Sequence, residues 1–149
     1  MVVKPDSASF PPPNAQPHAS WETRGFWEGA GRGELVLQWC TECSAVQHKP
    51  RGLCVDCLSD EGLVHFVASG EGTVHSFTVT EQNQAKGFVD VCPYIMAYIR
   101  LAEGPRILSA ITECDPDSVA IGSSVRAAFV AQERTDEEAV AEPGFHLCC

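Results

Sequence analysis

The sequence predicts a mainly β protein in which a metal-binding ribbon is followed by a small β-barrel. Three observations lead to this prediction. Two Cys-x-x-Cys pairs are separated by ten residues. From Ser69 onward, apolar and polar residues alternate with a period of two, which is typical of half-buried strands. The strand-like segments are short and turn residues separate them, a pattern that favours a small closed barrel.

The two cysteine pairs can bring four thiolates to one tetrahedral metal centre. A single pair would be a weak signal, because redox dithiols share it, but two pairs at this spacing are typical of zinc ribbons. Zinc is favoured over iron, which also suits four sulfurs, and over disulfides or unpaired thiols. Because sulfur fills every coordination position, we expect the zinc to hold structure and not to do chemistry. The predicted ligands are Cys40, Cys43, Cys54 and Cys57.

The composition indicates one globular unit in a reducing compartment. The chain has 149 residues, of which 44% are hydrophobic, enough to form a core. Neither a membrane-spanning run of about 20 apolar residues nor a signal-peptide core is present. The remaining four cysteines lack the spacing of a disulfide framework, so we expect a cytoplasmic protein without a membrane span.

The charge balance argues against nucleic acid as a partner. Ten Lys and Arg residues stand against twenty Asp and Glu residues, which gives a net charge of −10. Proteins that bind nucleic acid normally carry a cationic stripe, because their affinity comes largely from displacing counterions at the phosphates. No region of this chain is net positive. We therefore expect no binding to nucleic acid.

The N-terminal region divides into two segments. Residues 1–19 are rich in proline and are predicted to be extended and disordered. Residues 20–33 are predicted to form a helical arm, with Ser20 as the N-cap and Gly29 or Gly31 at the end. The arm carries three large aromatic residues that would be costly to leave in water, and they either pack on the chain's own core or bind a partner. These residues are Trp21, Phe26 and Trp27.

The rest of the chain is predicted to contain a ribbon over 34–67, a barrel over 68–131 and an acidic tail over 132–149. The tail is poor in large apolar residues, so we expect it to be mobile as far as Phe145. The expected barrel strands cover residues 73–80, 95–101, 106–112 and 124–131.

Motifs in both modules resemble those of the DUF35 family. The resemblance covers residues 21–131 and is more specific than the cysteines alone, because independent motifs follow one another in the same order. The motifs are Phe26-Trp27-Glu28-Gly29, Leu37-Gln38-Trp39-Cys40, Ser69-Gly70-Glu71-Gly72-Thr73, Leu101-Ala102-Glu103-Gly104-Pro105-Arg106 and Ile121-Gly122-Ser123-Ser124-Val125. The resemblance implies a rubredoxin-like zinc ribbon followed by an OB-fold barrel.

Two positions depart from the family pattern. His65 and Phe66 stand where a tryptophan is common, and Ser44 follows the first cysteine pair where glycine is usual. Neither change removes a predicted metal ligand. We expect Ser44 to take the positive φ angle that glycine prefers.

The resemblance also implies a function. DUF35 proteins accompany thiolase-superfamily enzymes, namely thiolases, aldolases and acyltransferases that make or break a carbon–carbon bond. They are thought to scaffold the assembly and to help bind or channel an acyl thioester such as acyl-CoA. The chain is therefore predicted to be a non-catalytic subunit in a hetero-oligomeric complex with a thiolase-like enzyme. The alternative is a stand-alone zinc-ribbon and OB-fold module that binds nucleic acid or another protein.

The sequence itself also predicts that this chain does not carry the catalytic residues. Cys92 and Cys114 are the candidate nucleophiles, and neither has the electropositive setting that a reactive thiol needs. Long loops at a barrel mouth often carry function, so the segment 81–93 is predicted to lie near substrate. Residues predicted to lie near substrate or CoA are Lys49, Arg51, Lys86 and Phe88.

Overall fold

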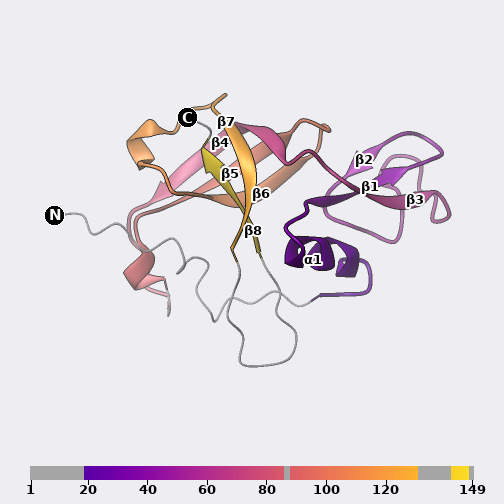
Figure 1. Cartoon of the computed structure of the whole chain (residues 1–149), viewed down its shortest axis with the longest axis horizontal. Helices are drawn as coiled ribbons and strands as arrows, with labels where there is room; N and C mark the ends of the chain where they lie inside the picture. Colours follow the sequence, from indigo (N-terminus) through magenta and orange to yellow (C-terminus); the bar gives the residue numbers. More distant parts are fainter. Residues whose placement is uncertain (1–18, 86–87, 131–141, 148–149) are drawn as a thin grey trace.

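The structure is a computed structural model that describes residues 19–85, 88–130 and 142–147. A helix, a three-stranded ribbon and a closed barrel follow one another along the chain (Figure 1). The predicted class, a mainly β protein with a zinc ribbon and a small barrel, is confirmed. Helix α1 contacts strand β1 of the ribbon and strand β8 of the barrel. The helix and the ribbon strands are α1 Arg24–Gly31, β1 Val36–Cys40, β2 Val46–Gln47 and β3 Leu63–Val67.

The barrel has the strand order of an OB-fold. Its strands close in the order β4-β5-β6-β8-β7, and β7 returns to pair with β4. The β6–β8 pair is parallel and the other neighbours are antiparallel. This is the five-stranded Greek-key barrel of OB-folds. The strands are β4 Glu71–Thr80, β5 Tyr94–Leu101, β6 Arg106–Thr112, β7 Ser124–Val130 and β8 Glu142–Leu147, and two single 3₁₀ turns are η2 Val89–Val91 and η3 Pro116–Ser118.

The prediction of an acidic tail over 132–149 is wrong for its last part. Residues 142–147 form β8, which lies between β6 and β7 and closes the barrel. The sequence hides this strand because Pro143 and Gly144 have low strand propensity. The strand forms because β6 and β7 would otherwise leave unpaired edges, and β8 satisfies both. Cys148 and Cys149 lie outside the described residues, as does the proline-rich lead up to residue 18.

The barrel core follows the predicted alternation. On β5, the alternate residues Ile95, Ala97, Ile99 and Leu101 are all buried, and they pack with residues from β4, β6 and β7. Gly72 is required where β4 crosses β5, because a Cβ there would lie 2.7 Å from Ile99 Cγ2 and 2.8 Å from the carbonyl oxygen of Arg100. The buried core of the barrel includes Val74, Ile95, Ala97, Ile99, Leu101, Ile107, Ile111 and Val125.

The helix is shorter than the predicted arm. It begins at Arg24, after Thr23 as N-cap, and no side chain caps it. Ser20 is not the N-cap, because residues 21–23 form a turn ahead of the helix. The end at Gly31 is confirmed, and the chain turns there through Gly33, whose φ is +75°.

Candidate metal centre and docking surface

The four predicted cysteine ligands meet at one point. All four Sγ atoms lie within 4.8 Å of one another. Cys40 Sγ and Cys57 Sγ are 3.6 Å apart, and Cys43 Sγ and Cys54 Sγ are 3.5 Å apart. A tetrahedral zinc with Zn–S bonds of about 2.3 Å would separate its sulfurs by about 3.8 Å. The cluster therefore fits a four-sulfur zinc site.

The two knuckles that hold the sulfurs have the same backbone geometry. Ser44 N–H donates to the Cys40 carbonyl at 2.9 Å, and Leu58 N–H donates to the Cys54 carbonyl at 3.0 Å. Ser44 has φ of +65° and Leu58 has φ of +63°, in the region that glycine prefers. The prediction for Ser44 is confirmed. Leu58 follows the second cysteine pair as Ser44 follows the first, so its positive φ could have been predicted in the same way.

Two buried glutamines, which the sequence reasoning missed, hold the segment between the knuckles. Gln38 Nε2 donates to the Arg51 carbonyl at 3.0 Å, and Gln38 Oε1 accepts the Arg51 N–H at 2.8 Å. Gln47 Nε2 donates to Gln38 Oε1 at 2.8 Å and to the Leu53 carbonyl at 3.2 Å. Gln47 Oε1 accepts the Val55 N–H at 2.9 Å. The two side-chain amides therefore supply hydrogen-bond partners to the backbone on both sides of the ligand Cys54.

The zinc site is closed to substrate. Cys40 and Cys54 are fully buried, whereas Cys43 and Cys57 face the surface. His48 and His65 lie outside the four-sulfur cluster. With four thiolates as ligands, zinc has no open position for a water or a carbonyl group, so its role is structural.

The three aromatic residues of the arm have different environments. Phe26 is 6% exposed and belongs to the core, where it contacts Trp27 edge-on at 5.0 Å and His48 at 5.3 Å between ring centroids. Trp27 is partly buried against the same core. Trp21 is 73% exposed. Of the two expected alternatives, Phe26 therefore packs on the chain's own core and is not available to a partner, whereas Trp21 is exposed.

Trp21 lies over the ribbon segment that leads into the second cysteine pair. Its ring lies over Gly52, where an added Cβ would be 2.8 Å from Trp21 Cη2. The following segment carries three more large apolar side chains that are at least half exposed. We call these four residues the ribbon surface: Trp21, Leu53, Val55 and Leu58.

The residues predicted to lie near substrate do not form one site. Lys49 and Arg51 are exposed on the ribbon, whereas Phe88 packs against Tyr94, with ring centroids 6.0 Å apart, beside η2. Figure 1 places η2 at the end of the barrel away from the ribbon. Lys86 lies outside the described residues. The prediction grouped these residues by their charge or aromatic character, and the fold places them in different parts of the molecule.

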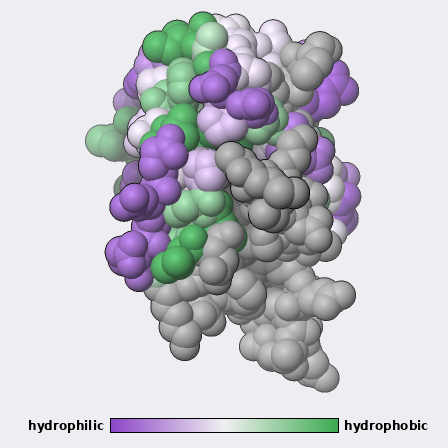
Figure 2. Space-filling model, turned by 90° about the vertical axis from the view of Figure 1, so that its left-hand side faces the viewer, coloured by the Kyte–Doolittle hydropathy of each residue, from purple (hydrophilic) through white to green (hydrophobic). Residues whose placement is uncertain are grey.

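The two candidate nucleophiles belong to the barrel and its loops. Cys92 is half-buried and its Sγ donates to the Phe88 carbonyl at 3.4 Å, while Cys114 packs against the core. The end of the barrel away from the ribbon shows polar and apolar side chains interspersed, without one broad apolar area among the coloured residues (Figure 2). In the part of the chain that is described, no helix is long and apolar enough to span a bilayer.

The environment of His48 gives a prediction about pH. Burial, with the nearby charge of Lys49 adding to it, lowers the pKa of His48 from 6.5 to about 4. In the unfolded chain the His48 imidazole is therefore protonated below about pH 6.5, whereas in the folded chain it is protonated only below about pH 4. We expect this group to reduce stability as the pH falls through that window, by about 3 kcal/mol at its lower end.

The measurement is urea unfolding of the zinc-loaded protein between pH 4 and 7, compared with His48→Gln. Acid also protonates the cysteine ligands, but it does so in both proteins. The difference between them should therefore isolate the histidine. Parallel stability curves for the two proteins would contradict the prediction.

Comparison with known proteins matches both modules of this chain, the zinc ribbon and the OB-fold, to family models. Residues 27–63 match the family model described as the ChsH2 rubredoxin-like zinc ribbon domain, and residues 67–130 match the ChsH2 C-terminal OB-fold domain. The chain is 35% identical over 114 residues to a DUF35 domain-containing scaffold protein of Methanothermobacter thermautotrophicus, covering 76% of this chain and 85% of the relative. The chain belongs to the DUF35 family.

Two other comparisons bear on function. The chain is 34% identical over 118 residues to the 3-oxo-4,17-pregnadiene-20-carboxyl-CoA hydratase alpha subunit of Mycobacterium tuberculosis, which covers 77% of this chain but 36% of that protein. It also resembles a chain of the solved Ltp2-ChsH2(DUF35) aldolase, with a TM-score of 0.74 and 27% identity. That match covers 89% of this chain and 98% of the other.

Proposed function

We propose that this chain is a non-catalytic scaffold subunit of a thiolase-type complex that makes or breaks a carbon–carbon bond in an acyl thioester. The observation that carries the proposal is the likeness to the DUF35 chain of an aldolase, which extends over 98% of that chain. Relatives of similar length are named scaffold proteins.

The chemistry of the described residues supports a subunit without its own active site. The one cluster of metal-ligating residues found among them is a closed four-cysteine site. Cys92 Sγ donates to the Phe88 carbonyl, an acceptor that cannot take up the thiol proton and so cannot generate a thiolate. The nucleophile and base of the complex then belong to the partner.

The ribbon surface is the proposed docking site for the partner. Large apolar side chains at the centre of an interface supply most of its binding energy, and tryptophan is enriched among such residues. Lys49 and Arg51 are both exposed and precede the same segment of the ribbon, and we propose that they meet an anionic group of an acyl-CoA held between this surface and the partner. Phe88 is left out of this proposal because it lies at the other end of the barrel. No disulfide links the six described cysteines to one another, which is compatible with the cytoplasm.

The test is co-expression with a candidate thiolase-like enzyme, followed by size exclusion and an acyl-transfer or retro-aldol assay. Trp21→Ala should weaken assembly by about thirty-fold, because truncating a central interface residue costs about 2 kcal/mol. The variant should remain folded, since Trp21 is 73% exposed. Ile121→Ala is the matched control, because Ile121 is equally exposed but lies on the barrel.

Two results would contradict different parts of the proposal. If the partner is fully active and soluble without this chain, the scaffold function fails. If the complex forms and Trp21→Ala assembles as well as Ile121→Ala, only the ribbon surface is excluded.

A further inference from the structure

The outward side of three barrel strands carries positive and aromatic side chains close together. Arg100 on β5 lies opposite Arg106 on β6, and Tyr98 lies opposite Leu108 two pairs further along. Residues two apart on a strand share a face, so these four side chains point to the same side of the sheet. His75, at the β-bulge of β4, joins them through Arg106. We call these five residues the basic face.

The two arginines of the basic face lack a negative partner. Like charges directly opposite each other in a sheet are destabilising. Within residues 19–85, 88–130 and 142–147, no carboxylate is within ion-pairing distance of Arg100 or Arg106. Arg106 Nη1 instead lies 3.1 Å from His75 Nε2, which orients the guanidinium without neutralising it. By contrast, Arg126 on β7 is paired with Glu71 at 2.8 Å. On an acidic chain, this juxtaposition is suited to an external anion.

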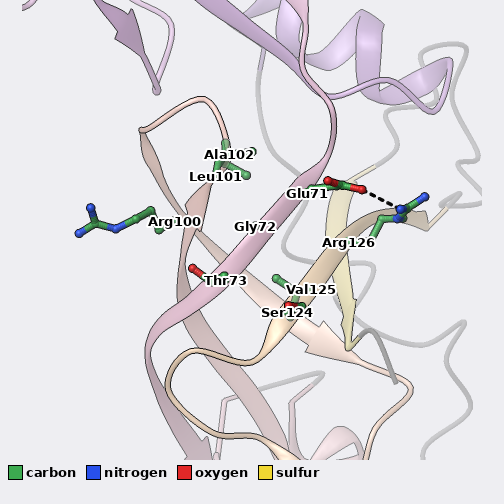
Figure 3. A pocket seen from close by; sticks show the side chains of 9 residues that line it. All are labelled: Glu71, Gly72, Thr73, Arg100, Leu101, Ala102, Ser124, Val125 and Arg126. Atoms are coloured by element: carbon green, nitrogen blue, oxygen red, sulfur yellow. Dashed lines mark hydrogen bonds and ion pairs between the residues drawn. The ribbon is translucent and has the colours of Figure 1, made fainter.

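A surface depression adjoins the basic face. Its volume is about 580 Å³, within the range of small-molecule sites. Arg100 stands on one side and the Arg126–Glu71 pair on the other, with Thr73 and Ser124 between them (Figure 3). Figure 3 shows Arg100 extending away from the sheet and from the Arg126–Glu71 pair, so its guanidinium stands at the outer side of the depression.

The exposed aromatic ring narrows the class of ligand. Tyr98 and Leu108 are both about half exposed, at 48% and 54%. A tyrosine ring beside arginines can stack on a planar base, and guanidinium groups bind phosphate oxygens in pairs. The outer face of the second and third strands is also where OB-folds commonly bind their ligands. Two unpaired arginines match one diphosphate, whereas a nucleic-acid strand needs a longer basic track than this chain provides.

We propose that the basic face and the adjoining depression bind a nucleotide, with its phosphates on Arg100 and Arg106 and its base against Tyr98. The histidine at position 75 positions Arg106 and does not itself carry the ligand. This site does not depend on the scaffold function, because it involves the barrel and not the ribbon surface.

The experiment is an NMR titration of the zinc-loaded full chain with ADP. We expect saturable shifts at amides of β5 and β6, and binding at least about ten-fold weaker in Arg100→Gln and in Arg106→Gln, because each removes a charge-assisted hydrogen bond. Arg32→Gln is the matched control, since Arg32 is exposed, is paired with Glu34 and belongs neither to the basic face nor to the lining of the depression. The thermal midpoint of Arg100→Gln should not fall, because the substitution relieves repulsion between like charges.

Three outcomes would overturn the proposal. The first is that ADP produces no saturable shifts at millimolar concentration. The second is that adenosine binds as tightly as ADP, or that Arg32→Gln weakens binding as much as Arg100→Gln, which would remove the role of the two arginines. The third is that an oligothymidylate binds more tightly than ADP with a steep dependence on salt, which would indicate a single-stranded nucleic-acid site instead.

Discussion

Stripping zinc from this protein should unfold its ribbon while the barrel remains folded. The ribbon strands are short, β2 having only two residues, so the ribbon buries little apolar area without the metal. In zinc-finger peptides, metal binding supplies about 10–16 kcal/mol of folding free energy, which is the largest single contribution we expect here. Elemental analysis of protein purified without added metal should show about one zinc per chain.

The barrel provides an internal reference for this experiment. Its strands close on one another and supply most of the buried core, so amide signals from β4 to β7 should persist in strong chelator while those of residues 36–67 collapse. Cys54→Ser should reproduce the effect, because it removes a buried ligand. Cys92→Ser is the matched control, since Cys92 lies in the barrel loop outside the four-sulfur cluster. A chain that binds no zinc and keeps its ribbon signals in chelator would contradict the prediction.

The metal site could be predicted from the sequence because its information is local. Each knuckle is a short turn whose ligand spacing fixes the direction of both sulfurs, and two such turns determine the centre. The positive φ at Ser44 was predictable for the same reason, since the turn needs it whatever the rest of the fold does. The barrel strands β4 to β7 were predictable because one face of each strand is buried and the period of two is visible.

The features that were missed depend on contacts between distant segments. Strand β8 has little strand propensity of its own and forms because β6 and β7 each need a neighbour. Phe26 looked like a partner anchor because apolar residues of an arm are equally suited to a core or an interface. In the structure Phe26 is buried in the core, where its ring contacts Trp27 and His48. The grouping of Arg51 with Phe88 failed because charge and aromaticity carry no information about which end of the molecule a loop occupies.

Gln38 and Gln47 were also missed because they join distant segments, and we expect their replacement to reduce the stability of the protein strongly. Both side chains are nearly fully buried, at 4% and 3% exposed. Substitution of Gln47 by Leu would leave the Val55 N–H and the Leu53 carbonyl without the amide that now pairs with them. An unsatisfied buried polar group costs about 1–3 kcal/mol, so we expect Gln47→Leu to lower the free energy of unfolding by about 2–5 kcal/mol.

The same substitution should weaken metal binding. Val55 follows the ligand Cys54 directly, so the hydrogen bond from Val55 N–H to Gln47 Oε1 fixes the backbone that presents this sulfur. Partners that orient metal ligands typically contribute about 10- to 100-fold in metal affinity, and we expect a loss of that size in competition with a zinc chelator. Gln84→Leu is the matched control, because Gln84 is an exposed glutamine on the barrel loop.

The double variant tests whether the two glutamines act together. Gln47 Nε2 donates to Gln38 Oε1, so either single change already breaks part of the pair, and Gln38→Leu with Gln47→Leu should cost less than the sum of the two. Urea unfolding of the four proteins in excess zinc measures this coupling. Additive losses would show that each glutamine supports its own stretch of backbone. Unchanged stability and zinc affinity in Gln47→Leu would show that the backbone from residue 51 to residue 55 is held by the metal alone.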